Sequence, residues 1–123
     1  MSSVVVIEDS PTQAQQIAAH LTGLGFEVYL AADGPEGLHL VDEVVPDAVV
    51  LDINLPSMNG FQVCRRLKRD GNLAHIPIIM LTSSDGSDDI LQGLDMGATD
   101  YIPKDAYASD NLVATLAALG LMA

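Results

Sequence analysis

The 123-residue sequence is poor in basic side chains and in aromatic rings. Lysine and arginine together number 5 against 17 aspartates and glutamates, which gives a formal net charge of -12. Nucleic-acid backbones and anionic membrane surfaces are held by clustered Lys and Arg, so this charge argues against direct binding to either. Tryptophan is absent and aromatic residues make up 4% of the chain. The core must therefore be built from aliphatic side chains.

Cysteine and long apolar segments are also scarce. The single cysteine, Cys64, cannot form a disulfide within the chain, which agrees with a reducing compartment, and we interpret it as a small core residue. The first residues carry no basic side chain, and the apolar run over 4–7 is too short for a signal peptide. No stretch approaches transmembrane length. We expect one cytoplasmic domain that spans residues 1–123.

Five short apolar runs rich in Val and Ile are separated by longer amphipathic stretches. Apolar runs without alternation are typical of parallel strands that are covered on both faces. The expected strands are residues 4–7, 26–30, 48–51, 76–81 and 99–102.

Helical patterns follow each of these runs. The first helix begins at Pro11, where Ser10 and Gln13 match a capping box. Asp33 can cap the second helix, which Pro46 ends. The others are expected over about residues 59–69, from about residue 87 to a terminator at Gly97, and over about residues 109–119.

Five strand–helix units in strict alternation predict an α/β fold with a parallel sheet and helices on both faces. Strands of this length suit the flavodoxin-like (βα)5 arrangement with strand order 2-1-3-4-5. Neither a linker nor a second domain is indicated.

Three carboxylates leave the strands where ligands bind in such a sheet. Binding occurs beyond the carboxyl ends of the strands, where the strand order reverses, here between the first and third strands. Glu8 and Asp9 follow the first strand and Asp52 follows the third. Converging like charges favour protonation unless a cation compensates. Few carboxylates, several waters and phosphate oxygens suit Mg²⁺, so we predict a Mg²⁺ site.

Two further side chains lie at the same edge of the predicted sheet. Thr82 closes the fourth strand and Lys104 follows the fifth. Lysine can pair with a carboxylate and then with a phosphoryl oxygen. Thr82 offers a hydroxyl to the same oxygen. The pattern therefore favours binding of a phosphoryl group beside the acids.

Taken in order, these motifs resemble those of the response-regulator receiver domain of two-component systems, and the chain is similar to single-domain chemotaxis regulators. Each motif alone is weak, but the ordered set covers essentially the whole chain. The matching segments are Glu8-Asp9, residues 49–56 around Asp52, Met58-Asn59-Gly60, Leu81-Thr82-Ser83, and residues 97–102 followed by Lys104.

The resemblance implies that Asp52 is the phosphoacceptor. It also implies that Asp9, Asp52 and the backbone carbonyl of Asn54 hold Mg²⁺, while Glu8 acts through a water. Thr82 and Lys104 resemble the residues that contact the phosphoryl group. Such a domain is a phosphoacceptor with at most self-phosphorylation and self-dephosphorylation activity, rather than an enzyme.

The resemblance also implies a switch. Tyr101 matches an aromatic residue that turns inward when the threonine, here Thr82, moves. Ser83 matches a small residue beside the site, and Ser84 a variable residue that tunes dephosphorylation.

The implied partners are a sensor histidine kinase or phosphotransfer protein, and a downstream protein that binds the face of the fourth helix, fifth strand and fifth helix. We expect a monomer or weak dimer. The chain could also be a receiver fragment of a hybrid kinase or longer regulator.

The segment around the lysine departs from the family pattern. The lysine is usually followed by a proline joined through a cis bond, whereas here Asp105 follows Lys104 and Pro103 precedes it. A cis bond before a non-proline residue costs about 2.5–4 kcal/mol. Because such a bond helps to aim Lys104, we expect the Lys104–Asp105 bond to be cis.

Other classes of protein fit less well. A Mg²⁺-dependent phosphohydrolase of the haloacid-dehalogenase type has its nucleophile after the first strand and its acidic pair late, and here no second acid stands at Asn54. A nucleotide or flavin module wants a Gly-rich or hydroxyl-rich loop after the first strand, where residues 8–11 would repel phosphate without a metal. A degenerate receiver that only binds partners is disfavoured by the complete set of acids with Thr82 and Lys104.

Overall fold

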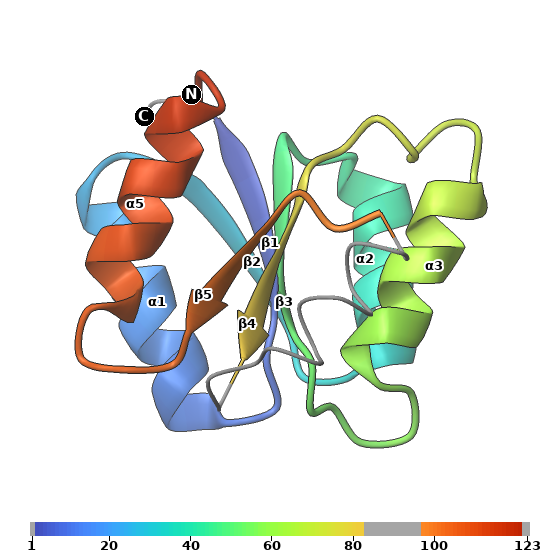
Figure 1. The fold of residues 1–123 in the computed structure, drawn as a ribbon, viewed down its shortest axis with the longest axis horizontal. Coiled ribbons are helices and arrows are strands. Elements are labelled where there is room, and N and C mark those ends of the chain that lie inside the picture. The colour runs from blue at the N-terminus through green and yellow to red at the C-terminus, as the bar shows by residue number, and fades with distance from the viewer. Residues whose placement is uncertain (1, 83–96, 122–123) are drawn as a thin grey trace.

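A five-stranded parallel sheet runs through the centre of the molecule (Figure 1). The structure, a computed structural model, describes residues 2–82 and 97–121. The strand order is β2-β1-β3-β4-β5, as predicted, and the fold is the flavodoxin-like α/β arrangement. The strands are β1 (Ser3–Ile7), β2 (Glu27–Ala31), β3 (Ala48–Asp52), β4 (Ile78–Thr82) and β5 (Asp100–Pro103).

Helices cover both faces of the sheet, and each face has its own hydrophobic cluster. The helices are α1 (Pro11–Gly23), α2 (Gly34–Val44), α3 (Gly60–Arg69) and α5 (Ala108–Ala118). Figure 1 shows α1 and α5 on one face, and α2 and α3 on the other. The helix predicted to begin near Ser87 lies outside the described residues.

The central strands lack polar alternation because both of their faces are buried. Every residue of β3 is buried, and Val4 to Ile7 of β1 are fully shielded from solvent. Alternate residues of β3 enter different clusters: Val49 packs towards α2 and α3, whereas Val50 packs towards α1 and α5. The unbroken apolar runs therefore do correspond to strands of a doubly covered parallel sheet.

The helix ends follow the predicted capping residues with one correction. The Asp33 side chain accepts a hydrogen bond from the Glu36 amide at the start of α2. The Ser10 hydroxyl accepts one from the Gln13 amide at the start of α1, but only this half of the predicted capping box is present in the described part of the chain. A complete capping box occurs at α3 instead, between Asn59 and Gln62.

The fourth strand begins at Ile78, two residues later than predicted. Ile76 is buried, but its amide donates to the Leu73 carbonyl in a turn, and its own carbonyl accepts a hydrogen bond from the Lys68 ammonium group. Ile76 is thus apolar because it is buried, and in the sequence it could not be told apart from the strand residues that follow it.

The single cysteine is a core residue, as predicted. Cys64 lies on α3 within the cluster that α2 and α3 form against the sheet. Burial raises the pKa of its thiol to about 11. Within residues 2–82 and 97–121, no helix is both long and apolar enough to cross a membrane.

Candidate functional site

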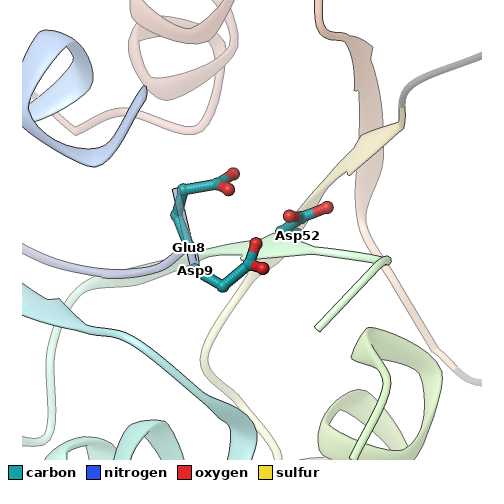
Figure 2. A group of neighbouring side chains, drawn as sticks. All are labelled: Glu8, Asp9 and Asp52. Atoms are coloured by element: carbon teal, nitrogen blue, oxygen red, sulfur yellow. The ribbon is translucent and has the colours of Figure 1, made fainter. Parts of the chain in front are cut away.

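Three carboxylates meet at the carboxyl edge of the sheet (Figure 2). Glu8 and Asp9 follow β1, and Asp52 is the last residue of β3. One carboxylate oxygen from each lies within 4.8 Å of the others. Glu8 and Asp52 are 2% and 1% exposed, while Asp9 is open to solvent. The topology therefore brings these acids together as expected from the sequence.

Backbone hydrogen bonds hold the two buried acids in place. The Glu8 amide donates to the Ala31 carbonyl at 3.0 Å, which continues the pairing of β1 with β2. The Ser10 amide donates to Glu8 Oε1 at 3.1 Å. In the same way, the Asn54 amide donates to Asp52 Oδ1 at 3.0 Å. One oxygen of each buried carboxylate is thus fixed by the loop that follows it.

Lys104 bridges the two buried carboxylates. Its Nζ lies 2.7 Å from Asp52 Oδ2 and 3.0 Å from Glu8 Oε2. Burial by itself would lower the pKa of Lys104, but the hydrogen bonds and charges of Asp52 and Glu8 outweigh it and raise the pKa above its usual value. The Lys104 side chain therefore stays charged and supplies one positive charge to the acids.

The expected cis bond is absent, and that prediction was wrong. All peptide bonds of the described residues are trans, including the one between Lys104 and Asp105. The Lys104 amide donates to the Thr82 carbonyl at 2.7 Å, and the Asp105 amide donates to the Pro103 carbonyl at 2.9 Å. This turn lets Lys104 reach both carboxylates through the trans peptide that non-proline residues strongly prefer.

One positive charge leaves the acidic cluster incompletely compensated. The pKa of Glu8 is raised from 4.5 to about 7, mainly because the side chain is buried and also because Asp52 lies close to it. Hydrogen bonds from the Ser10 amide and from Lys104 limit the rise. A further cation would therefore stabilise the ionised crevice.

The remaining predicted residues lie at neighbouring positions. Thr82 ends β4, is buried, and pairs with Pro103 in the register of β4 with β5. Tyr101 lies on β5 opposite Met80 and packs partly buried against the cluster on the side of α2 and α3. Asn54 follows β3 and is exposed. Ser83 and Ser84 fall outside the described residues.

Gly60 lets the start of α3 approach the backbone next to Asp52, a role that the sequence analysis did not assign to it. A Cβ atom at this position would lie 2.4 Å from the Asp52 carbonyl oxygen and 2.8 Å from Ile53 Cα. The Gly60 amide donates to the Ile53 carbonyl at 2.9 Å. Ser57, in the same loop, has a positive φ of 67° although it is not a glycine. The motif Met58-Asn59-Gly60 was the only signal for this close approach.

The site is thus an acidic cluster bridged by a lysine, at the point of a parallel α/β sheet where the strand order reverses and ligands commonly bind. Comparison with known proteins shows which family of such proteins the chain belongs to. The model of the response regulator receiver domain family matches residues 4–117. The chain therefore belongs to the response regulator receiver domain family, whose members are signalling domains of two-component systems.

Individual relatives agree with this assignment. The chain is 40% identical over 101 residues to the response regulator PleD of Caulobacter vibrioides, which is 82% of this chain and 22% of PleD. The chemotaxis protein CheY4 of Vibrio cholerae superposes with a TM-score of 0.90 at 30% identity, covering 96% of this chain and 98% of CheY4. The chain spans less than half the length of the curated relatives it matches.

A third relative was solved with a metal. The receiver domain of the sensor histidine kinase PA1611 of Pseudomonas aeruginosa has magnesium coordinated in its active-site cleft. It superposes with a TM-score of 0.86 at 28% identity, covering 97% of this chain and 98% of that domain. Receiver domains thus bind Mg²⁺ at an acidic pocket, and this chain has an acidic cluster of the corresponding kind.

Proposed function

We propose that this chain is a phosphorylation-dependent switch that accepts a phosphoryl group on Asp52 from a sensor histidine kinase or phosphotransfer protein. The observation that carries the proposal is the placement of Asp52, a buried carboxylate at a strand end, 2.7 Å from Lys104 and beside two other acids. Family membership supports the same conclusion.

In the proposed transfer, a carboxylate oxygen of Asp52 attacks phosphorus while the P–N bond of the donor phosphohistidine breaks. The product is an acyl phosphate, and the imidazole leaves with the bonding electron pair. The Asn54 amide and the Lys104 ammonium group hold the two oxygens of Asp52 in one orientation. Lys104 then neutralises charge on the phosphoryl oxygens, to which the Thr82 hydroxyl also donates.

The donor set suits Mg²⁺, because it consists of oxygens alone and its carboxylates lie within 4.8 Å of one another. We propose that Asp9, Asp52 and the Asn54 carbonyl hold the ion, with Glu8 acting through a water. When bound, Mg²⁺ neutralises negative charge on the transferring group.

The proposed change in partner binding depends on the same residues. Binding of the phosphoryl group by Thr82 and Lys104 biases a rearrangement after β4 in which Tyr101 turns inward. The face formed by the predicted fourth helix, β5 and α5 then binds a downstream protein. We propose that the domain comprises residues 1–123 and works in the cytoplasm as a monomer or weak dimer, alone or within a hybrid kinase or longer regulator.

Incubation of the purified chain with Mg²⁺ and a small acyl phosphate tests the proposal. We expect intact-mass spectrometry to show the addition of one phosphoryl group, which hydroxylamine removes because an acyl phosphate is cleaved by nucleophiles. A chain that gains no phosphoryl group but turns over a generic phosphate ester would contradict the proposal and favour a phosphohydrolase.

Mg²⁺ binding should weaken as the pH falls through about 7. Glu8 has its pKa raised to about 7 in the metal-free protein, so protons compete with the cation for the crevice in this range. Glu8 also affects folding stability in the metal-free state. Between pH 4.5 and 7 the native chain binds more protons than the unfolded chain, so the free energy of unfolding falls as the pH rises. Calorimetric titration at pH 6 and 8 measures the affinity for Mg²⁺. The variant Glu8→Gln should lack this pH dependence, and equal wild-type affinities at both pH values would contradict the prediction.

A further inference from the structure

The few cations of this acidic chain are gathered on one helix. Of 5 Lys and Arg residues, only Lys104 lies outside α3. The others are Arg65, Arg66, Lys68 and Arg69, in the second half of that helix. The remainder of the molecule is strongly acidic. The surface of α3 is therefore of opposite sign to its surroundings.

Lys68 is used within the fold, whereas the three arginines are not. The Lys68 ammonium group donates to the carbonyls of Ala74 and Ile76 at 3.0 and 2.9 Å, and burial lowers its pKa. The three arginines are exposed and, among residues 2–82 and 97–121, no carboxylate lies within ion-pair distance of them. Arg69 follows Arg65 by four residues and Arg66 by three, so its guanidinium group lies on the same side of the helix as theirs and is repelled by both.

The arginines border two hollows. One, of about 250 Å³, is lined by Met58, Gln62 and all three arginines. The other, of about 400 Å³, lies between α2 and α3 and is lined by Arg66 and Arg69 with leucine side chains and two carboxylates. The leucines of that second hollow are Leu38, Leu67 and Leu73. In the second hollow, guanidinium groups thus lie beside leucine side chains, an arrangement that fits a segment bearing both carboxylates and an apolar side chain.

We propose that this arginine surface, formed by Arg65, Arg66 and Arg69, is a docking site for an acidic segment of a partner protein. Carboxylates of the segment pair with the guanidinium groups, for which arginine geometry is well suited. An adjacent apolar side chain of the segment enters a hollow. A nucleic acid fits less well, because its extended phosphate backbone also meets the acidic remainder of a molecule of net charge -12. The surface is separate from the phosphoacceptor crevice and does not depend on its chemistry.

Helix stability offers a simpler reason for basic residues here. Arg66 and Arg69 lie in the last turn of α3, where cations interact favourably with the helix dipole. That interaction does not account for Arg65, nor for the absence of carboxylate partners in the described part of a chain with 17 acidic residues. The two explanations can be distinguished by experiment, because only the proposed docking site requires an acidic peptide to bind at the arginines.

The test uses the full chain and a synthetic peptide with glutamates on both sides of a leucine. We expect the peptide to shift the backbone amide resonances of α3 and its flanking loops, and to bind more weakly as salt increases. The triple variant R65Q/R66Q/R69Q should bind about tenfold or more weakly. Its melting temperature should stay within about 5 °C of the wild type, since exposed side chains contribute little to stability.

A matched control separates the surface from net charge. The variant Q16E/A19E/T22E carries the same added negative charge at exposed positions on α1, and should keep the wild-type affinity for the peptide. Equal weakening in both variants would overturn the proposal, because the effect would then follow from net charge alone.

Three other results would also overturn it. A large fall in the melting temperature of R65Q/R66Q/R69Q would show that the chain itself already occupies the arginines. A single-stranded DNA oligonucleotide that binds α3 more tightly than the peptide would assign the surface to nucleic acid. Arginine-dependent self-association in sedimentation, unaffected by the peptide, would assign it to a second copy.

Discussion

Replacement of Asp52 with asparagine should abolish phosphoryl labelling of the chain by a small acyl phosphate with Mg²⁺. A carboxamide oxygen is a far weaker nucleophile than a carboxylate, and the substitution also removes the charge that pairs with Lys104 at 2.7 Å. Intact-mass spectrometry measures the label, and peptide mapping measures its position. Glu8 is the other buried carboxylate in contact with Lys104 among the described residues, at 3.0 Å, but burial raises its pKa to about 7, so it is partly protonated at neutral pH and is a poorer nucleophile. We therefore expect complete loss.

The matched control is Asp42→Asn. Asp42 is exposed on α2 and lies outside the acidic cluster, so the variant changes charge by the same amount and should label like the wild type. Thermal unfolding of both variants checks that loss of label does not reflect loss of fold. Labelling of Asp52→Asn that persists and maps to another residue would remove Asp52 from its proposed role.

Replacement of Gly60 with alanine should destabilise the fold and disturb the site. The new Cβ would lie 2.4 Å from the Asp52 carbonyl oxygen and 2.8 Å from Ile53 Cα, and both are backbone atoms that cannot rotate away. Overpacking of this kind costs about 2 kcal/mol, which should lower the melting temperature by roughly 5–10 °C. We also expect weaker Mg²⁺ binding, because the loop shifted by the clash includes Asn54.

Gly71→Ala is the control for this prediction. Gly71 is exposed, and no heavy atom lies within 4 Å of a Cβ added there. Its stability should therefore remain within about 0.5 kcal/mol of the wild type. If Gly60→Ala and Gly71→Ala melt at the same temperature, the loop is able to move aside and the close approach of Gly60 has no structural importance.

The fold could be predicted from sequence because local and global patterns agree in this chain. Unalternating apolar runs indicate strands with two buried faces, and the alternation of strands with helices then fixes a parallel sheet. The predicted strand limits were wrong where a residue is apolar and buried but does not pair with a neighbouring strand. Ile76 is buried in a turn before β4, and Phe26, expected in the second strand, instead closes the end of α1 through a hydrogen bond to Leu21.

The convergence of acids at the site was also predictable, because topology alone places Glu8, Asp9 and Asp52 at one edge. The path of the backbone was less so. The trans peptide after Lys104 did have a signal, because Asp105 is not a proline and bonds before non-proline residues strongly prefer trans, but the resemblance to the family led to the opposite expectation. The residue types carry no signal for the positive φ of Ser57, because that conformation is usually associated with glycine.

The burial of Cys64 makes the protein convenient for spectroscopy. Its side chain is fully shielded from solvent and its thiol has a pKa of about 11, so almost no reactive thiolate exists at neutral pH. A cysteine introduced on the surface would then be the single site for a maleimide dye or spin label, with no background substitution needed. Pairs of such labels on β5 and α5 would test directly whether their separation changes when the chain is treated with a small acyl phosphate and Mg²⁺.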